Sequence, residues 1–357
     1  MRVPLIYREA PTFGFDIGSR TVKAIQIHSS GRHHRVGGYG YTEFPPDAIV
    51  EGIIADPELI AKSVQNLLHK PAAGHIASRR AIVALPTAKV FIRTLQLPQM
   101  TTGDLEQAIR FEAEQYVPVP ISDLYIDYEI IGRTPGGKAD DHGHTDLLMV
   151  AAPRAIVDSY IKLFDALNLE LSAIETSLTS IARSFLTSTA AQQTVLMIDF
   201  GSRSADAAVL NKVIRLTGSI PVGGDDITRS LVKSLNIKFD QADEIKYKFG
   251  IGPSGLQPKI MESLDSTLKT MSAELKKLLK FYQERSENKD PVTQVSISGG
   301  TAGMPGLAEY IQKELGLPVT VTNPWAGLNM GHLPAISKVE APMYATAIGL
   351  ALRGDHD

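Results

Sequence analysis

A short motif, Asp-x-Gly-Ser-Arg, occurs twice in the chain and constrains its fold more than any other sequence feature. Residues 15–24 and 198–207 share an Asp, a Gly, a Ser, an Arg, a hydroxyl residue and an Ala at equivalent positions. Each copy follows an apolar run of β type, so each is expected to form the turn of a β-hairpin. One copy indicates only a tight turn whose Asp bonds its own backbone. Two copies that open the two halves of the chain predict a duplicated binding site.

The residue types in this turn suit a phosphate group. Glycine lets the backbone bend so that successive N–H groups point at one anion, and Ser or Thr hydroxyls add further donors. Arginine is equally suited to an exposed hairpin position, so its contact with phosphate is one of two alternatives. The candidate phosphate ligands are Gly18, Ser19, Arg20, Thr21 and Lys23 in the first turn, and Gly201, Ser202, Arg203 and Ser204 in the second.

An aspartate precedes each of these turns. Asp16 and Asp199 cannot bind phosphate themselves, because two anions repel each other. Their expected role is to hold Mg²⁺ or its water shell beside the phosphates.

A third motif, Ser-Gly-Gly-Thr-Ala-Gly-Met-Pro-Gly-Leu at residues 298–307, lies between an expected strand and an expected helix. Taken alone, it could be a simple strand-to-helix turn. With the two phosphate turns, it resembles the adenosine motif of the actin/Hsp70 superfamily. That resemblance implies ATP and Mg²⁺ as ligands and an α/β, actin-like (ribonuclease H-like) fold of two lobes.

The resemblance extends the candidate nucleotide site beyond the two turns. Residues 241–246 resemble the superfamily helix whose Ala-Glu-x-x-Lys pattern contacts ribose and adenine, although Asp243 stands at the Glu position. Residues 345–351 are similar to a connecting helix whose small residues allow a close helix crossing between the two halves. The further candidate nucleotide ligands are Gly223, Gly224, Asp243, Lys246, Gly299, Gly300, Thr301 and Ala302.

Composition excludes several classes of function. The formal charge of −3 gives no basic excess for nucleic acid, and the absence of cysteine excludes disulfides and thiolate sites. No run of about 18 apolar residues and no secretory signal are found, so we expect a cytoplasmic chain without a membrane span.

The order of apolar runs and periodic segments is that of an α/β protein with an insertion. We expect a first lobe of residues 1–86 and 169–194, completed by the C-terminal segment 325–357. An inserted strand-helix-strand-strand module spans residues 87–168, and a second lobe spans residues 195–324.

The inserted module identifies a branch of the superfamily. Residues 91–98, 108–114 and 116–120 resemble the strand, the acidic helix and the closing Tyr-x-Pro-x-Pro segment of the type IV pilus assembly protein PilM family. The related cell-division protein FtsA is the alternative, but FtsA proteins end in an amphipathic helix, whereas the C-terminal residues here are short and polar.

Membership of the PilM family implies a role in assembly. The expected partner is the N-terminal tail of a PilN-like inner-membrane protein, held in a groove between the inserted module and the first lobe. ATP is expected to set the shape of that groove. The chain would then lie at the cytoplasmic face of the inner membrane through this partner, and self-association is an open alternative.

A small-molecule kinase of the same superfamily is a less favoured alternative, because no added general base is found. Active relatives have a carboxylate near the attacking water, and this chain has Ser177 at that position. Glu175, two residues away, is the candidate catalytic residue. We therefore expect at most slow ATP hydrolysis. His142 and His144 could suggest a metal site with neighbouring aspartates, but a solvated loop is favoured there.

Overall fold

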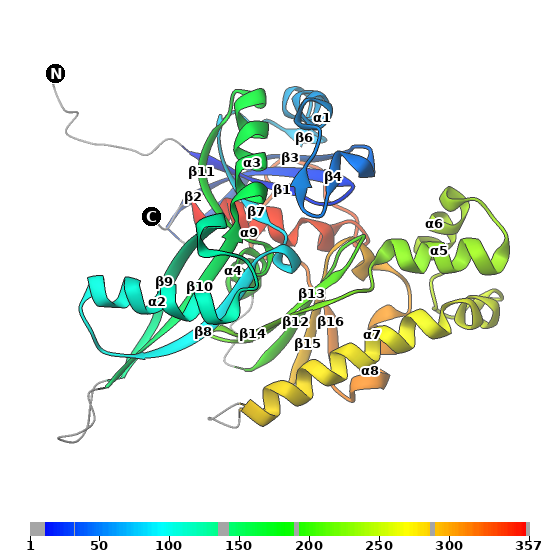
Figure 1. Cartoon of the computed structure of the whole chain (residues 1–357). Helices are drawn as coiled ribbons and strands as arrows, with labels where there is room; N and C mark the ends of the chain where they lie inside the picture. Colours follow the sequence, from blue (N-terminus) through cyan, green and yellow to red (C-terminus); the bar gives the residue numbers. More distant parts are fainter. Residues whose placement is uncertain (1–10, 32, 135–142, 189–192, 286–289, 355–357) are drawn as a thin grey trace.

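The computed structural model describes residues 11–31, 33–134, 143–188, 193–285 and 290–354, and within these residues the strands form four sheets. A seven-stranded sheet and a five-stranded sheet each form the centre of a lobe, and a three-stranded sheet forms a module at one side (Figure 1). This arrangement confirms the predicted actin-like α/β architecture.

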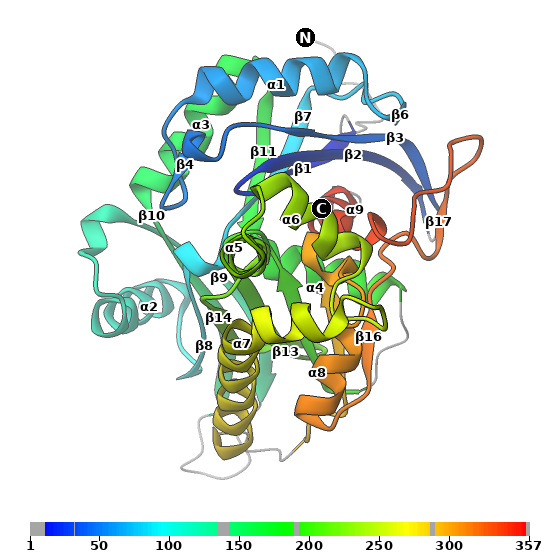
Figure 2. The ribbon, with the colours of Figure 1, turned by 90° about the vertical axis from the view of Figure 1, so that its right-hand side faces the viewer.

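The first lobe is built on the seven-stranded sheet, whose strands follow the order β11-β7-β1-β2-β3-β17 with β6 added to β3. Helices α1 and α3 cover one face (Figure 2), and helices α4 and α9 lie against the other. The strands are β1 (Thr12–Ile17), β2 (Thr21–Ser30), β3 (His33–Glu43), β6 (Ala73–Gly74), β7 (Arg80–Leu85), β11 (Glu170–Thr176) and β17 (Leu328–Asn329). The helices are α1 (Pro57–His69), α3 (Arg154–Leu167), α4 (Ser177–Ser188) and α9 (Ala345–Arg353).

Helix α1 shows how local sequence fixes these elements. Asp56 is its N-cap and accepts a hydrogen bond of 2.9 Å from the backbone N–H of Leu59, and Pro57 occupies the first turn. Ile60 and Val64 are fully buried on the face that meets the sheet. The predicted end of this helix near Lys70 is also confirmed.

The first lobe also contains a short two-stranded hairpin, and a 3₁₀ turn leads from this lobe into the module. The hairpin consists of β4 (Ile49–Val50) and β5 (Ile53–Ile54) and follows the 3₁₀ turn η1 (Pro46–Ala48). The 3₁₀ turn η2 (Thr87–Lys89) carries the chain out of β7 and into the module.

The module has the predicted strand-helix-strand-strand order, and its sheet has the order β8-β10-β9 with antiparallel neighbours. Its elements are β8 (Phe91–Pro98), α2 (Thr102–Tyr116), the 3₁₀ turn η3 (Ile121–Asp123), β9 (Leu124–Thr134) and β10 (His144–Pro153). Leu105, Ile109 and Ala113 of α2 pack with Leu95 and Leu147 of the sheet, so the module has a small hydrophobic core of its own.

Helix α3, which the sequence interpretation assigned to the module, packs against the first lobe. Its Tyr160, Leu163 and Phe164 are buried in one cluster with Phe13 and Phe15 of β1. The Phe164 ring meets the Phe15 ring edge to face at 5.6 Å. The sequence of residues 153–167 indicates a helix but does not specify which sheet it covers.

The second lobe is built on the five-stranded sheet, in the order β14-β13-β12-β15-β16. Its elements are β12 (Val195–Phe200), β13 (Ala205–Asn211), β14 (Val213–Ile220), α5 (Gly224–Leu235), α6 (Phe239–Lys248), α7 (Gln257–Arg285), β15 (Gln294–Ser298), the 3₁₀ turn η4 (Gly300–Gly303), α8 (Leu307–Leu315) and β16 (Val319–Val321). Leu264, Leu268 and Leu275 of the long helix α7 are buried in this lobe's core, as their spacing predicts.

The two lobes meet at α4, which crosses α9 and also buries Leu178 and Ile181 with Val195 and Ala208 of the second lobe; the 3₁₀ turn η5 (Ala341–Tyr344) precedes α9. A Cβ atom at Gly349 would lie 1.9 Å from the carbonyl oxygen of Ser180, and one at Gly14 would lie 2.0 Å from the carbonyl oxygen of Ala347. Backbone therefore touches backbone on two sides of α9, which agrees with the predicted close crossing. Among the described residues, no helix is both long enough and apolar enough to cross a lipid bilayer.

Candidate nucleotide site

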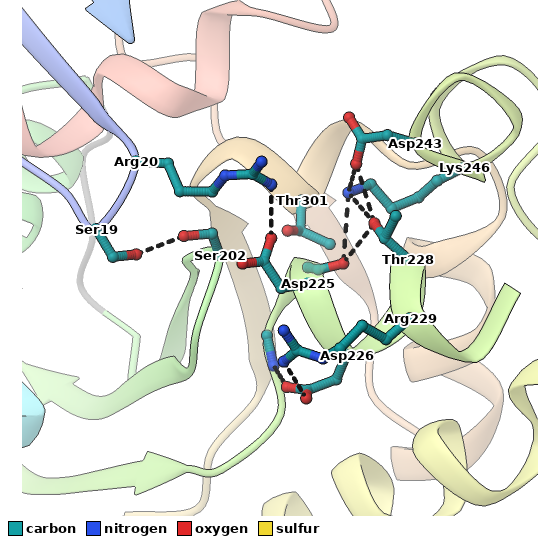
Figure 3. Close-up of polar contacts among 12 residues, drawn as sticks. Ser19, Arg20, Ser202, Asp225, Asp226, Thr228, Arg229, Asp243, Lys246 and Thr301 are labelled. Carbon is teal, nitrogen blue, oxygen red and sulfur yellow. Dashed lines mark hydrogen bonds and ion pairs between the residues drawn. The ribbon is translucent and has the colours of Figure 1, made fainter. Parts of the chain in front are cut away.

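The two Asp-x-Gly-Ser-Arg motifs form matching hairpin turns that face each other. The N–H of Gly18 donates to the carbonyl of Thr21 at 2.9 Å, and the N–H of Gly201 makes the equivalent bond to Ser204 at 3.0 Å. The hydroxyl oxygens of Ser19 and Ser202 lie 2.5 Å apart (Figure 3). The duplicated sequence thus produces a duplicated turn, one from each lobe.

Asp16 and Lys23 form an ion pair beside the first turn. They are cross-strand neighbours in β1 and β2, and Lys23 Nζ lies 3.1 Å from Asp16 Oδ2. Both side chains are only 12–14% exposed. Lys23 therefore balances the charge of Asp16 in a site with limited access to water.

The second turn has a different charge arrangement. Asp199 is the cross-strand neighbour of Asp206, another carboxylate, where the first turn has lysine. Burial, then the charges of Asp16 and Asp206, raise the pKa of Asp199 to about 7, although Lys23 and the Ser298 hydroxyl oppose this shift. The Ser298 hydroxyl donates to Asp199 Oδ1 at 3.2 Å.

Asp206 is a residue that the sequence analysis missed. It is buried, burial raises its pKa, and its Oδ1 atom has no hydrogen-bond partner in the described part of the chain. Superposing the two motifs puts Asp206 where Lys23 stands in the first copy, so the signal was present in the repeat. Hydrogen bonds from Ser219 and from the backbone of Ala88 compensate this carboxylate only in part, and two neighbouring carboxylates suit a divalent cation.

The carboxylates of the two turns supply only part of the ligand set that Mg²⁺ needs. Across the described ranges, no three His, Asp or Glu side chains converge as a complete ligand set. Mg²⁺ usually takes one or two carboxylates and completes its coordination with water and phosphate oxygens. Asp16 and Asp199 fit that mode of binding.

The loop before α5 closes against the second turn. The N–H of Gly224 donates to the carbonyl of Gly201 at 3.0 Å, and the N–H of Asp225 donates to that of Ser202 at 2.8 Å. A Cβ atom at Gly223 would lie 2.4 Å from the Ser202 oxygen. These contacts explain why glycine stands here, and they place the start of α5 beside the second Asp-x-Gly-Ser-Arg turn.

Helix α6 contributes a buried lysine. Lys246 is 3% exposed, and its Nζ donates to Asp243 Oδ1 at 2.6 Å and to Thr228 Oγ1 at 2.9 Å (Figure 3). Asp243, at the position of the expected Glu, is thus the partner of Lys246. Burial, with the charges of Asp243 and Asp225, raises the pKa of the neighbouring Tyr247 to about 12, so its hydroxyl stays protonated at neutral pH.

The predicted adenosine motif also meets the second turn. Gly299 has a φ of 89°, and a Cβ atom there would lie 2.7 Å from Asp199 Oδ1. The Thr301 hydroxyl is 3.4 Å from the Gly201 carbonyl, and Ala302 is buried. Gly300 has only the Tyr247 hydroxyl near its Cβ position, at 4.0 Å. The structure therefore gathers the three motifs at one place.

The equivalent arginines of the two turns cross between the lobes. Arg20 Nη1 pairs with Asp225 of α5 at 3.0 Å, and its guanidinium lies 4.9 Å from the centre of the Phe239 ring. Arg203 Nη1 donates to the carbonyl of Ile49, in β4 of the first lobe, at 3.1 Å. Each arginine thus contacts the lobe that does not carry it. Thr21 and Ser204 serve their turns through the backbone carbonyls described above.

The candidate catalytic residue Glu175 forms ion pairs. Arg183 donates to both of its carboxylate oxygens, at 2.6 and 2.7 Å, and Arg353 lies 3.3 Å away. These bonds hold α4 and α9 to the sheet. The hydroxyl of Ser177 lies 2.8 Å from that of Thr87. A catalytic role for Glu175 stays a prediction.

Two other features lie away from this site. His144 is 3.9 Å from Asp146, while His142 falls outside the described residues. A groove of about 710 Å³ separates the module from the second lobe, and its lining includes Thr94 of β8, Ile214 of β14 and Phe281 of α7. None of the residues predicted to bind nucleotide lines this groove.

Comparisons with known proteins agree with this geometry. The family described as "Type IV pilus assembly protein PilM" matches residues 14–355. A solved PilM-PilN type IV pilus biogenesis complex contains a chain with a TM-score of 0.84 and 22% identity, covering 98% of this chain and 100% of that chain. MreB5 of Spiroplasma citri bound to AMPPNP has a TM-score of 0.54 and 13% identity, with 97% and 96% coverage.

Sequence relatives include the cell-division protein FtsA. FtsA of Neisseria meningitidis serogroup B is 25% identical over 339 residues, which cover 85% of this chain and 78% of that protein. FtsA of Pseudomonas aeruginosa is 23% identical, with 96% and 88% coverage. These similarities agree with the actin-like fold, and the family match covers nearly the whole chain: this protein belongs to the type IV pilus assembly protein PilM family.

Proposed function

We propose that this protein is an ATP-binding scaffold of the type IV pilus inner-membrane assembly complex. It binds the N-terminal tail of a PilN-like membrane protein in a manner linked to nucleotide. The observation that carries the proposal is the meeting of two matching phosphate turns, one from each lobe, through Ser19 and Ser202 beside Asp16 and Asp199.

The residues of the cleft divide into three roles. Backbone N–H groups and hydroxyls of the two turns bind the phosphates. Asp16 and Asp199 hold Mg²⁺, which supplies positive charge to the phosphate oxygens. Gly224, Lys246 and Thr301 form the adenosine side, where a Cβ atom at Gly224 would lie 2.4 Å from Thr301 Oγ1.

Phosphate binding requires the Ser19 and Ser202 hydroxyls to separate, and the two turns are proposed to move apart with them. The Ser19 and Ser202 oxygens are in direct contact at 2.5 Å, whereas two hydroxyls that bond one phosphate oxygen lie roughly 4–5 Å apart. Nucleotide therefore acts as a wedge between the two turns and changes the angle between the lobes. ATP serves mainly as a structural ligand, with at most slow hydrolysis.

The partner's tail is proposed to bind between the module and the first lobe. Strand β9 lies at one edge of the module sheet, and α3 leads from that sheet into the first lobe. Tyr125 of β9 and Ile161 of α3 are 41% and 40% exposed. An extended peptide could add to the edge of β9 and cover these residues. The tail would hold the protein at the cytoplasmic face of the inner membrane.

A binding experiment tests this function. Titration of a fluorescent ATP analogue with Mg²⁺ should give saturable binding to the wild type and a loss of at least tenfold in affinity with Asp16→Ala. A labelled PilN tail peptide should bind with different affinity when the analogue is present, since coupling between two ligands is reciprocal. Tyr125→Ala should lower the affinity for the peptide but not the affinity for the nucleotide. Absence of nucleotide binding to the wild type would remove the basis of the proposal.

A further inference from the structure

The β4–β5 hairpin is a small element with an unusual position. Its two strands are joined by a two-residue turn, in which Glu51 and Gly52 have φ values of 51° and 85°. Positive φ at both central residues is the type I′ geometry that matches the twist of paired strands. A Cβ atom at Gly52 would lie 2.9 Å from Lys89 Cγ, so the turn is pressed against η2.

Three contacts join this hairpin to three different parts of the molecule. At its first strand, the Ile49 carbonyl accepts the bond from Arg203 of the second phosphate turn. At its turn, the Glu51 carboxylate pairs with Lys89 of η2. At its last strand, the Ile54 N–H donates to the buried Ser159 hydroxyl of α3 at 3.1 Å.

These partners occupy key positions in the chain path. Lys89 lies in the turn by which the chain enters the module, and Ser159 lies in the helix by which it leaves. Arg203 directly follows Ser202, which touches the opposite phosphate turn. The hairpin therefore contacts the entrance of the module, its exit and the nucleotide cleft.

The charges around Glu51 favour the same connection. Its pKa is held below the usual range mainly by the hydrogen bond and charge of Lys89, with a further contribution from Arg203. The carboxylate thus lies within the field of one cation from the module entrance and one from the cleft. Movement of Arg203 changes both a hydrogen bond to the hairpin and the electrostatic environment of its turn.

We propose that the β4–β5 hairpin transmits nucleotide occupancy from Arg203 to the inserted module through the Glu51–Lys89 pair. The inference rests on the proposed nucleotide binding. When phosphate separates the two turns, Arg203 moves relative to the first lobe. The hairpin follows through Ile49, and η2 follows through Lys89, which shifts β8 and the rest of the module.

The test uses variants that break the link without touching the phosphate turns. Glu51→Asn removes the carboxylate but leaves an Asn-Gly turn, which favours type I′ geometry. Lys89→Gln removes the other charge. Asp265→Asn is the matched control, because Asp265 pairs with Lys269 at 2.8 Å on the exposed face of α7, away from the hairpin. Folding of each variant is checked by its melting temperature.

The measurement is amide hydrogen exchange across residues 87–98, with and without AMPPNP and Mg²⁺, on the whole chain. The wild type and Asp265→Asn should show a nucleotide-dependent change in protection of at least threefold. Both hairpin variants should lose most of this change while AMPPNP affinity stays within twofold, and the double variant should behave like either single one.

The possible failures are distinguishable. Normal AMPPNP binding with a full change in exchange in both hairpin variants overturns the role of the hairpin and leaves the proposed function intact. A wild type that binds AMPPNP with no change at residues 87–98 also overturns it. A wild type that binds no AMPPNP contradicts the proposed function itself.

Discussion

Asp206 lies opposite Asp199 in the β12–β13 ladder, at the position that Lys23 occupies opposite Asp16 in the β1–β2 ladder. One hairpin thus has a paired carboxylate, and its repeat has two carboxylates side by side. Asp16 and Asp206 both raise the pKa of Asp199. The duplicated turns are alike in backbone but not in charge, which gives the second turn the greater need for a cation.

The raised pKa of Asp199 predicts a pH dependence of stability. Its usual pKa is 3.8 and its pKa in the folded chain is about 7. Between these values the folded chain holds a proton that the unfolded chain has released, so the stabilisation is present at low pH and is lost as pH rises through 7. Asp199→Asn should remove this loss. Relative to the variant, the wild type should lose free energy of unfolding between about pH 4 and 7, by at most about 4 kcal/mol. Urea unfolding measures it, and a pH-independent difference contradicts the assignment.

Asp206→Asn should relieve the repulsion between the two carboxylates. The variant should be more stable than the wild type at pH 8 by about 1 kcal/mol, because a buried charge without a full set of partners is removed. Its affinity for ATP should also depend less on Mg²⁺, as calorimetric titration with and without the metal can determine. Asp290→Asn, at an exposed site away from the cleft, is the control. Lower stability of Asp206→Asn at pH 8 would indicate that the carboxylate is well compensated.

Gly299→Ala tests the contact between the adenosine motif and Asp199. A methyl group would lie 2.5 Å from the Phe200 carbonyl oxygen and 2.7 Å from Asp199 Oδ1, on a backbone with φ of 89°, so we expect destabilisation of about 3 kcal/mol and at least tenfold weaker ATP binding. Gly316→Ala is a matched control, since Gly316 has φ of 67° but no atom within 4 Å of its Cβ position. That variant should lose about 1 kcal/mol and keep its ATP affinity. Equal effects of the two changes on ATP binding would contradict crowding as the cause.

Glu175→Gln separates a structural role from a catalytic one. Loss of the charge that binds Arg183 and Arg353 in a buried setting should cost about 2–4 kcal/mol of stability. ATP affinity should change less than twofold. Single-turnover hydrolysis, measured on protein saturated with ATP, should change little relative to the wild type. A hydrolysis rate that falls tenfold or more in folded protein would instead assign catalysis to Glu175.

Local sequence predicted the turns of the candidate site, because backbone turns depend on nearby residues. The positions of Gly18 and Gly201 specified two hairpins, and the glycines at 299 and 300 specified a strand-to-helix connection. The helix predicted from about Met304 begins at Leu307, since residues 300–303 form a 3₁₀ turn and Gly306 has a φ of 83°.

Contacts between lobes could not be predicted in the same way. The partners of Arg20 and Arg203 are Asp225 and Ile49, more than 150 residues away in the sequence. Their identity depends on how the two lobes are placed, which no local pattern encodes. The packing of α3 could not be predicted for a related reason, since an amphipathic pattern indicates that a helix is buried but not which sheet buries it.

The glycines on two sides of α9 have a mechanical consequence. Where side chains interlock, two elements can slide only if rotamers change and packing is lost for a time. Gly14 brings β1 onto α9 within the first lobe, and Gly349 brings α9 onto α4 at Ser180, so these two contacts are between bare backbones and contain no interlocked side chains. The crossing of α4 and α9 is held instead by hydrogen bonds from Ser180 and Arg183 to the carbonyls of Thr346 and Gly349, so a change of angle there would strain these bonds rather than repack a core.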